Sequence, residues 1–223
     1  MLTLESQTAP AGIAPENEPI IRAALYNLFA TALARGIDES WLNPHFQRHL
    51  AVGLPDQEGK PEMLRALKKM AANREFLREI QLDYDALFLV PGPQLIFPYE
   101  SCYTYPNSDG TFGRLWQKPA QHMYSILQDW GIKFADGWDL IPDHIGVELY
   151  FMAELCRFEA ETKLDRHQLE QWQREFFKTH LHPWIFKLVD NLEQKAATGF
   201  YRGVANLLRS FLLEEWQALN GSE

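Results

Sequence analysis

The strongest helix-like pattern in the chain spans residues 139–161. Apolar side chains recur there at the spacing of one helix face, at Ile145, Leu149, Met152 and Cys156. Pro142 suits the first turn of a helix, where a missing N–H group costs nothing, and the helix dipole favours Asp143 beside it. The pattern predicts a central, largely buried helix that presents Asp143 and His144 at its start.

Two interpretations of this start are open from the pattern alone. In the first, the carboxylate of Asp143 and the imidazole of His144 form a functional group at the mouth of the helix. In the second, Asp143 caps its own helix and His144 packs against a neighbouring segment.

Helical spacing recurs along most of the remaining chain. Further helices are expected to begin near Ile20, Asp38, Pro61, Pro119, Asp165, Ile185 and Gly199, and residues 81–90 can continue as a helix after the one from Pro61. The one from Pro61 should continue unbroken to Ile80. Almost no stretch alternates apolar and polar residues, so strands are not expected. The predicted fold class is all-α, a compact bundle of roughly nine or ten helices.

A long irregular loop should interrupt this helical chain. Proline and glycine at residues 91–93 exclude regular helix, Pro98 repeats the interruption, and residues 107–110 form a turn. Three tyrosines between residues 99 and 105 combine apolar faces with hydroxyl groups, which suits peptide recognition. The alternative is that they close the core where helices end.

Composition narrows the class of protein. The net charge of −9 at pH 7 argues against a nucleic-acid partner and for cationic or neutral ones. Two cysteines, Cys102 and Cys156, without a CxxC motif fit a reducing compartment. No apolar run has the length of a membrane span, and the N-terminus lacks the pattern of a signal peptide. We therefore expect a cytoplasmic protein that does not insert into membranes.

The domain organisation follows from the same patterns. Residues 1–19 are rich in Pro, Ala, Glu and Thr and are expected to form a disordered lead-in. Residues 20–223 should form a single all-helical domain.

Motifs for catalysis are missing from the sequence. It contains no GxxxxGK phosphate loop and no ExxH pair of the di-iron bundles. His144 and Glu148, four residues apart, could share a metal ion with His180 or His182, but zinc needs three or four converging ligands. A hydrogen bond or ion pair between His144 and Glu148 is the competing interpretation. The sequence therefore predicts that the protein is not an enzyme and that it binds no metal ion. The alternative is a metal-binding or small-molecule helical-bundle enzyme that uses His144, Glu148, His180 and His182.

Three groups of residues together carry a resemblance to a known family. They are Pro142-Asp143-His144 at the start of a helix; Leu87-Phe88 followed by an irregular loop and Pro98-Tyr99-Glu100-Ser101; and His180-Leu181-His182-Pro183-Trp184 with Phe200-Tyr201-Arg202. Taken in their order along the chain, they resemble the TorD/DmsD family of cytoplasmic redox-enzyme maturation chaperones, from about Tyr26 to the C-terminus. The family often has Glu directly before its Pro-Asp-His element, where this chain has Leu140 and Ile141.

The resemblance implies an all-helical, non-enzymatic protein. Such a chaperone binds the twin-arginine signal peptide and the catalytic subunit of a molybdenum-cofactor oxidoreductase, and it delays export until the cofactor is inserted. The resemblance implies no resident cofactor, although it does include weak binding of guanine nucleotides. It also implies a monomer or a dimer. The signal-peptide site falls on Tyr84, Leu87, Phe88, Pro98, Tyr99, Gly113, Asp143 and His144, to which we add Glu100 as a second carboxylate.

These residues lead to a mechanistic hypothesis. A cleft between the Tyr99 loop and the start of the central helix would admit the peptide, and Asp143 would bind one of its arginines. Phe88 and the tyrosines would receive the apolar part of the peptide. His144 would orient the site and make binding pH-sensitive, because an ordinary histidine changes charge near neutrality.

Overall fold

A computed structural model gives the structure of the protein and describes residues 18–133, 140–161 and 165–221. The first 17 residues of the predicted lead-in lie outside this description, as does Asp139 at the start of the predicted central helix. Residues 18 and 19, which were included in the lead-in, already belong to the first helix, α1 (Glu18–Ala34).

The described residues form ten α-helices and no strand, which confirms the predicted all-α bundle. After α1 come α2 (Pro44–Gly53), α3 (Lys60–Ala72), α4 (Arg74–Phe88), α5 (Glu100–Thr104), α6 (Lys118–Asp129), α7 (Ile145–Glu161), α8 (Arg166–Phe176), α9 (Ile185–Lys195) and α10 (Gly199–Asn220). A 3₁₀ turn, η2 (Glu39–Leu42), precedes α2, and a π-helical turn, η3 (Phe177–Leu181), extends α8.

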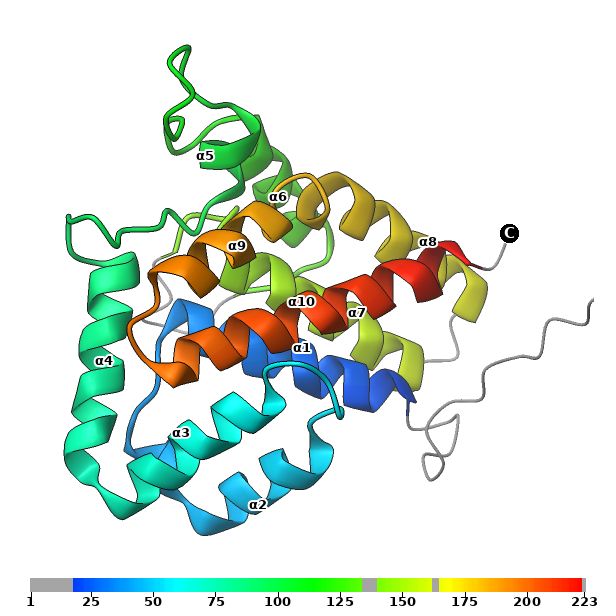
Figure 1. The fold of residues 1–223 in the computed structure, drawn as a ribbon. Coiled ribbons are helices and arrows are strands. Elements are labelled where there is room, and N and C mark those ends of the chain that lie inside the picture. The colour runs from blue at the N-terminus through cyan, green and yellow to red at the C-terminus, as the bar shows by residue number, and fades with distance from the viewer. Residues whose placement is uncertain (1–17, 134–139, 162–164, 222–223) are drawn as a thin grey trace, which may run out of the picture.

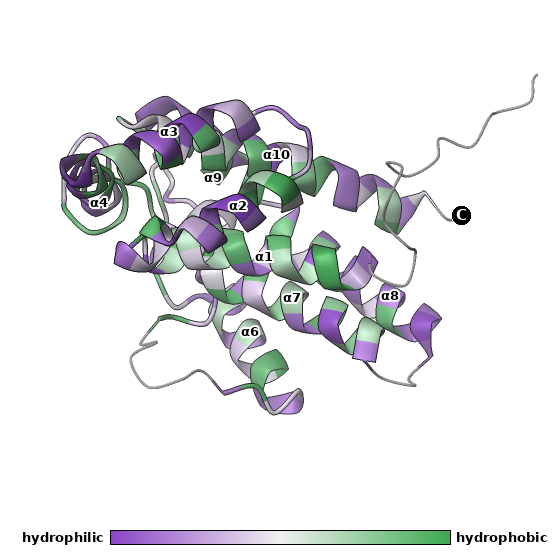
Figure 2. Ribbon diagram, turned by 90° about the horizontal axis from the view of Figure 1, so that it is seen from below, coloured by the Kyte–Doolittle hydropathy of each residue, from purple (hydrophilic) through white to green (hydrophobic). Residues whose placement is uncertain are grey.

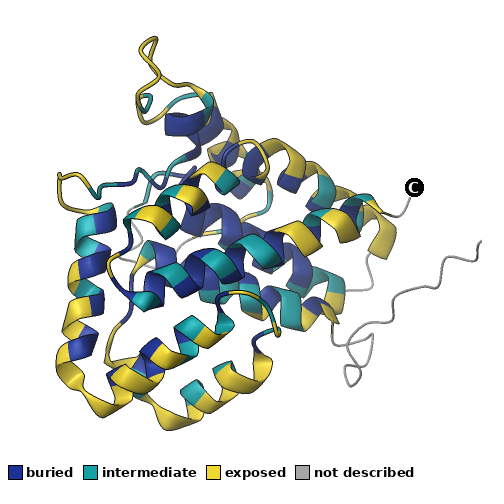
Figure 3. Cartoon of the chain, in the orientation of Figure 1, coloured by how far each residue is buried: buried dark blue, intermediate teal, exposed yellow. Residues whose placement is uncertain are grey.

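The core of the bundle lies where α1, α7 and α10 run across the middle of the molecule (Figure 1). The helix α1 packs along α7, and α10 packs against α3 and α9. Figure 3 shows α7 and α10 buried over much of their length, whereas α2 has no buried residue. Apolar and polar faces alternate around the helices in Figure 2, as the sequence pattern predicts. None of the described helices combines the length and the apolarity that crossing a bilayer requires.

Two helix boundaries differ from the prediction. The helix expected from Pro61 to Ile80 is broken at Asn73, whose side-chain oxygen accepts a hydrogen bond from the Glu75 N–H (3.0 Å) and so caps α4. The central helix α7 begins at Ile145, because Pro142 and Asp143 lie in a turn before it.

Other local signals were interpreted correctly. Pro119 lies in the first turn of α6, and Asp165 caps α8 by accepting a hydrogen bond from the His167 N–H. The predicted aromatic loop is irregular over residues 89–99 but contains a short helix, α5, which the sequence analysis did not foresee.

The start of α7 is held against the end of α1 by a close helix crossing at Gly146. A Cβ atom on this residue would lie 2.5 Å from the Cβ of Ala34 and 3.2 Å from the carbonyl oxygen of Ala30. Only glycine therefore allows the two helices to approach this closely, and their contact fixes the position of the preceding Asp143 and His144.

The crossing predicts a matched pair of effects on stability. Gly146→Ala should lower the free energy of unfolding by about 1–3 kcal/mol, because the added methyl group overpacks a filled contact. Gly53, also in a helix, is the control: a Cβ there meets nothing within 4 Å, so Gly53→Ala should be neutral or slightly stabilising. Urea denaturation of both variants measures the difference, and equal effects would contradict the close crossing.

Candidate functional site

The loop before α5 lies directly on the turn before α7. The Glu100 N–H donates to the Asp143 carbonyl (3.0 Å), and the Ile145 N–H donates to the Pro98 carbonyl (2.9 Å). These bonds form an isolated antiparallel bridge between Tyr99 and His144. The two segments therefore lie together, as the hypothesis from the sequence requires, but this backbone pairing closes the cleft expected between them.

Asp143 joins the two segments through its side chain. Its Oδ2 atom accepts hydrogen bonds from the backbone N–H of Ser101 (2.8 Å) and from the Ser101 hydroxyl. Ser101 lies in the first turn of α5, so this carboxylate caps a helix other than its own. Asp143 is 0% exposed. In this conformation a peptide arginine could reach it only if the residues around Ser101 moved, so the hypothesis of an open carboxylate at the helix mouth needs correction.

His144 has the capping role that was considered for Asp143. Its Nδ1 atom accepts a hydrogen bond from the Gly146 N–H in the first turn of α7 (2.9 Å). Its ring packs edge-on against the Tyr99 ring, with 5.1 Å between centroids. Burial lowers the pKa of His144 to about 3, so the imidazole stays neutral at physiological pH. The expectation that His144 titrates near neutrality is therefore wrong.

The predicted residues of α4 lie beside this junction. The rings of Tyr84 and Phe88 are 5.2 Å apart, and both contact Tyr201 of α10. Burial raises the pKa of Tyr84 to about 12, and the nearby Tyr99 phenol adds to the shift. The structure thus brings the end of α4 and the Tyr99 loop together. Leu87 is fully buried beneath them.

Gly113 is required by backbone packing. A Cβ atom at this position would lie 1.9 Å from the Tyr105 carbonyl oxygen, and the Gly113 N–H donates to the Cys102 carbonyl (2.9 Å). These contacts account for glycine here without a ligand. They hold the segment after the protruding turn at residues 107–110 against α5 (Figure 1).

Only part of the predicted site reaches solvent. Phe88, Tyr99 and Gly113 are half-buried, and the other six residues are buried: Tyr84, Leu87, Pro98, Glu100, Asp143 and His144. Two exposed apolar residues, Leu89 (62% exposed) and Val90 (53% exposed), follow Phe88 directly.

Asp85 is a candidate that the sequence analysis missed. It is half-buried and lies one helical turn before Phe88, so the two side chains share one edge of α4. The spacing of three residues between an acid and an aromatic residue was the available signal. We call Asp85, Phe88, Leu89, Val90 and Tyr99 the α4 patch.

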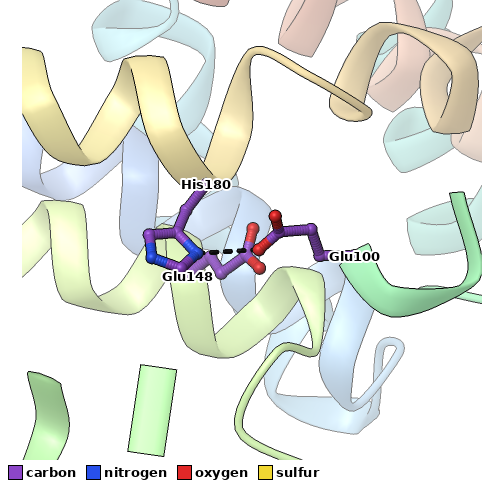
Figure 4. Close-up of side chains that lie close together, drawn as sticks. All are labelled: Glu100, Glu148 and His180. Carbon is purple, nitrogen blue, oxygen red and sulfur yellow. Dashed lines mark hydrogen bonds and ion pairs between the residues drawn. The ribbon is translucent and has the colours of Figure 1, made fainter. Parts of the chain in front are cut away.

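A second group of polar residues lies inside the protein, behind Tyr99. Glu100 of α5, Glu148 of α7 and His180 of η3 converge there (Figure 4). The Nδ1 atom of His180 lies 2.7 Å from Oε2 of Glu100. Burial raises the pKa of Glu100 and of Glu148, and His180 opposes the shift at Glu100. We call these three residues the buried cluster.

The buried cluster contains only half of the metal-binding set considered as an alternative from sequence. Glu148 and His180 belong to it, whereas His144 packs on Tyr99. His182 is exposed and stacks on the Trp216 ring at 4.2 Å. The side chain of Glu148 bonds to Trp184, which leaves the expected hydrogen bond between His144 and Glu148 without support.

The sequence is similar to a known protein family and to several chaperones. The family model described as nitrate reductase delta subunit matches residues 55–190, more than half of the chain. A chaperone protein TorD of Vibrio parahaemolyticus is 28% identical over 199 residues, 85% of this chain and 90% of the relative. The TorD chaperone of Photobacterium profundum is 28% identical over 91% of this chain and 95% of its own length. That of Shewanella loihica is 24% identical over 89% of this chain and 92% of its own length.

These matches confirm the resemblance that the sequence motifs indicated. The relatives are named as chaperones, which agrees with the prediction that the chain is not an enzyme.

The buried imidazole of His144 predicts a specific loss of stability in acid. Its pKa is about 3 in the folded protein and near 6.5 when unfolded, so the unfolded chain binds the extra proton between these values. The free energy of unfolding should therefore fall as the pH drops below about 6.5, by about 1.4 kcal/mol per pH unit from this group. His144→Asn keeps an acceptor for the Gly146 N–H and should lack this contribution. Urea unfolding between pH 6.5 and 4.5 compares the two slopes, and parallel slopes would refute a neutral buried His144.

Proposed function

The chain belongs to the nitrate reductase delta subunit family, and from this premise we propose that it binds the twin-arginine signal peptide of a redox enzyme. As in the TorD chaperones that it resembles over most of its length, its general role is maturation of a redox enzyme. We infer that the client is the catalytic subunit of a molybdenum-cofactor oxidoreductase, held in the cytoplasm until its cofactor is inserted. The family match is the observation that carries this proposal.

The α4 patch has the properties of a surface that binds the apolar part of the peptide. Phe88 packs on the Tyr84 ring, and Tyr99 lies close enough to Tyr84 to affect its pKa. Phe88 and Tyr99 are both half-buried, so part of each side chain stays exposed to solvent. Leu89 and Val90 extend the apolar area beyond the end of α4. An aromatic surface flanked by aliphatic side chains suits a short apolar helix or extended segment.

Asp85 is the accessible carboxylate of the patch. A guanidinium group can form two parallel hydrogen bonds to a carboxylate, a geometry that an ammonium group cannot reproduce. The net charge of −9 further favours approach of a cationic peptide. Within the proposal, Asp85 therefore takes the role that the sequence analysis gave to Asp143.

The buried residues of the predicted site support this surface from behind. Asp143 and His144 fix the backbone of Tyr99, and Pro98 and Glu100 flank it in the same pairing. Leu87 and Tyr84 fill the space beneath Phe88, and Gly113 holds the neighbouring segment. All nine residues then belong to one peptide-binding region, three at its surface and six beneath it.

Peptide binding tests the proposal directly. The probe is a labelled synthetic leader peptide that carries the twin-arginine motif and an apolar segment, and a version with two lysines in place of the two arginines is the comparison peptide. Fluorescence anisotropy should show binding of the arginine peptide and weaker binding of the lysine peptide. Asp85→Asn should lower the affinity for the arginine peptide about 5- to 10-fold, because a partly exposed charged contact contributes about 1 kcal/mol.

Two further variants separate the patch from general effects. Phe88→Ala should lower the affinity for both peptides, since it removes apolar contact area. Asp129→Asn changes the net charge equally on the exposed end of α6 and should leave both affinities unchanged. Equal affinity for the two peptides, or an effect of Asp129→Asn as large as that of Asp85→Asn, would refute the proposed site.

A further inference from the structure

The buried cluster has the composition of a ligand site rather than that of an ordinary core. One donor atom from each of Glu100, Glu148 and His180 lies within 4.8 Å of the other two. The three side chains come from α5, α7 and η3, so the tertiary fold brings them together (Figure 4). They are only 4%, 0% and 2% exposed, respectively. Because the site is buried, a negative charge on either carboxylate costs free energy unless a cation or a proton neutralises it.

The hydrogen bonds of the cluster leave this charge incompletely satisfied. Oε1 of Glu148 has no hydrogen-bond partner among the described residues, and the same is true of Oδ1 of Asp143 nearby. The negative charge of Asp143 raises the pKa of both glutamates further. The basic group that the structure pairs with Glu100 is the His180 imidazole. The cluster thus holds one imidazole for its two glutamates, and a third buried carboxylate, Asp143, lies near enough to affect their charge.

We propose that Glu100, Glu148 and His180 bind one divalent first-row transition-metal ion. Zn²⁺ accepts carboxylate oxygen and imidazole nitrogen as ligands, in sites of three or four protein ligands with water completing the shell. The imidazole nitrogen favours Zn²⁺ or Fe²⁺ over Ca²⁺ and Mg²⁺, which prefer oxygen ligands. Such an ion would supply the partner that Oε1 of Glu148 lacks.

Neighbouring groups orient the three ligands. The Trp184 indole N–H donates to Oε2 of Glu148 (3.1 Å), which leaves Oε1 of that carboxylate for the ion. The Nε2 atom of His180 lies 2.9 Å from Nδ1 of His122, so an imidazole that binds metal through Nδ1 can donate its other N–H there. A metal-bound histidine ordinarily donates its second nitrogen in this way.

The backbone around His180 also supports a site. His180 lies in the π-helical turn η3, and such turns inside α-helices occur frequently at functional sites. The Trp184 indole N–H that bonds Glu148 also lies 2.6 Å from the His180 carbonyl, which ties the turn to the cluster.

One member of the buried cluster, His180, borders a cavity at the surface, whereas Glu100 and Glu148 do not line it. The cavity has a volume of about 330 Å³ and is lined by His122, Ile126, Trp130, Phe176 and Thr179 among others. His122 is exposed at this cavity, so His180 has one side toward the buried carboxylates and the other toward the cavity. A metal site needs a path for loading and exchange, and this cavity reaches its histidine.

Equilibrium dialysis of the full chain against Zn²⁺, with metal content measured by mass spectrometry, tests the site. The protein is first stripped with a chelator. The wild type should take up one Zn²⁺ per chain, and Glu148→Gln and His180→Gln should each weaken binding at least about tenfold. Glu148→Gln keeps an acceptor for Trp184, and circular dichroism checks that each variant folds.

His182→Gln is the matched control, because His182 lies two residues beyond His180 but faces solvent. It should bind Zn²⁺ like the wild type. As a second readout, Zn²⁺ should raise the Tm of the wild type and not that of Glu148→Gln. The proposal is overturned if the wild type binds Zn²⁺ no more tightly than Glu148→Gln, which would indicate a proton shared between the two glutamates instead. The proposal is also overturned if His182→Gln and His180→Gln lower the affinity for Zn²⁺ equally. None of these outcomes depends on the peptide site.

Discussion

The buried carboxylate of Asp143 is the constraint on which the rest of the site depends. It links the turn before α7 to Ser101, 42 residues earlier, and two backbone hydrogen bonds accompany it. A buried acceptor left without its donors costs about 1–3 kcal/mol, so the two segments are held in one register. Without this connection nothing in the local sequence would place an irregular, proline-rich loop on the end of the central helix.

This connection separates an outer surface from an inner cluster. Tyr99 packs on His144 and belongs to the α4 patch, while the next residue, Glu100, bonds to His180 in the interior. Two adjacent residues at the start of α5 therefore belong to the proposed peptide surface and to the proposed metal site.

The sequence predicted what local signals determine. Helix positions, the start of α6 at Pro119 and the cap at Asp165 depend on neighbouring residues and were foreseen. The target of Asp143 was not, because its partner Ser101 is remote in sequence. His180 and His182 look alike in the sequence, and only the π-helical turn and its packing decide which one faces inward.

Amide hydrogen exchange at the junction tests this central constraint most directly. The account predicts that the amides of Glu100, Ser101 and Ile145 exchange slowly in the wild type, because each donates to a partner across the junction. In Asp143→Ala these three amides should exchange faster together, while those in the middle of α10 keep their protection. Rapid exchange of the three amides in the wild type, or an equal loss of protection throughout α10 in the variant, would contradict the account.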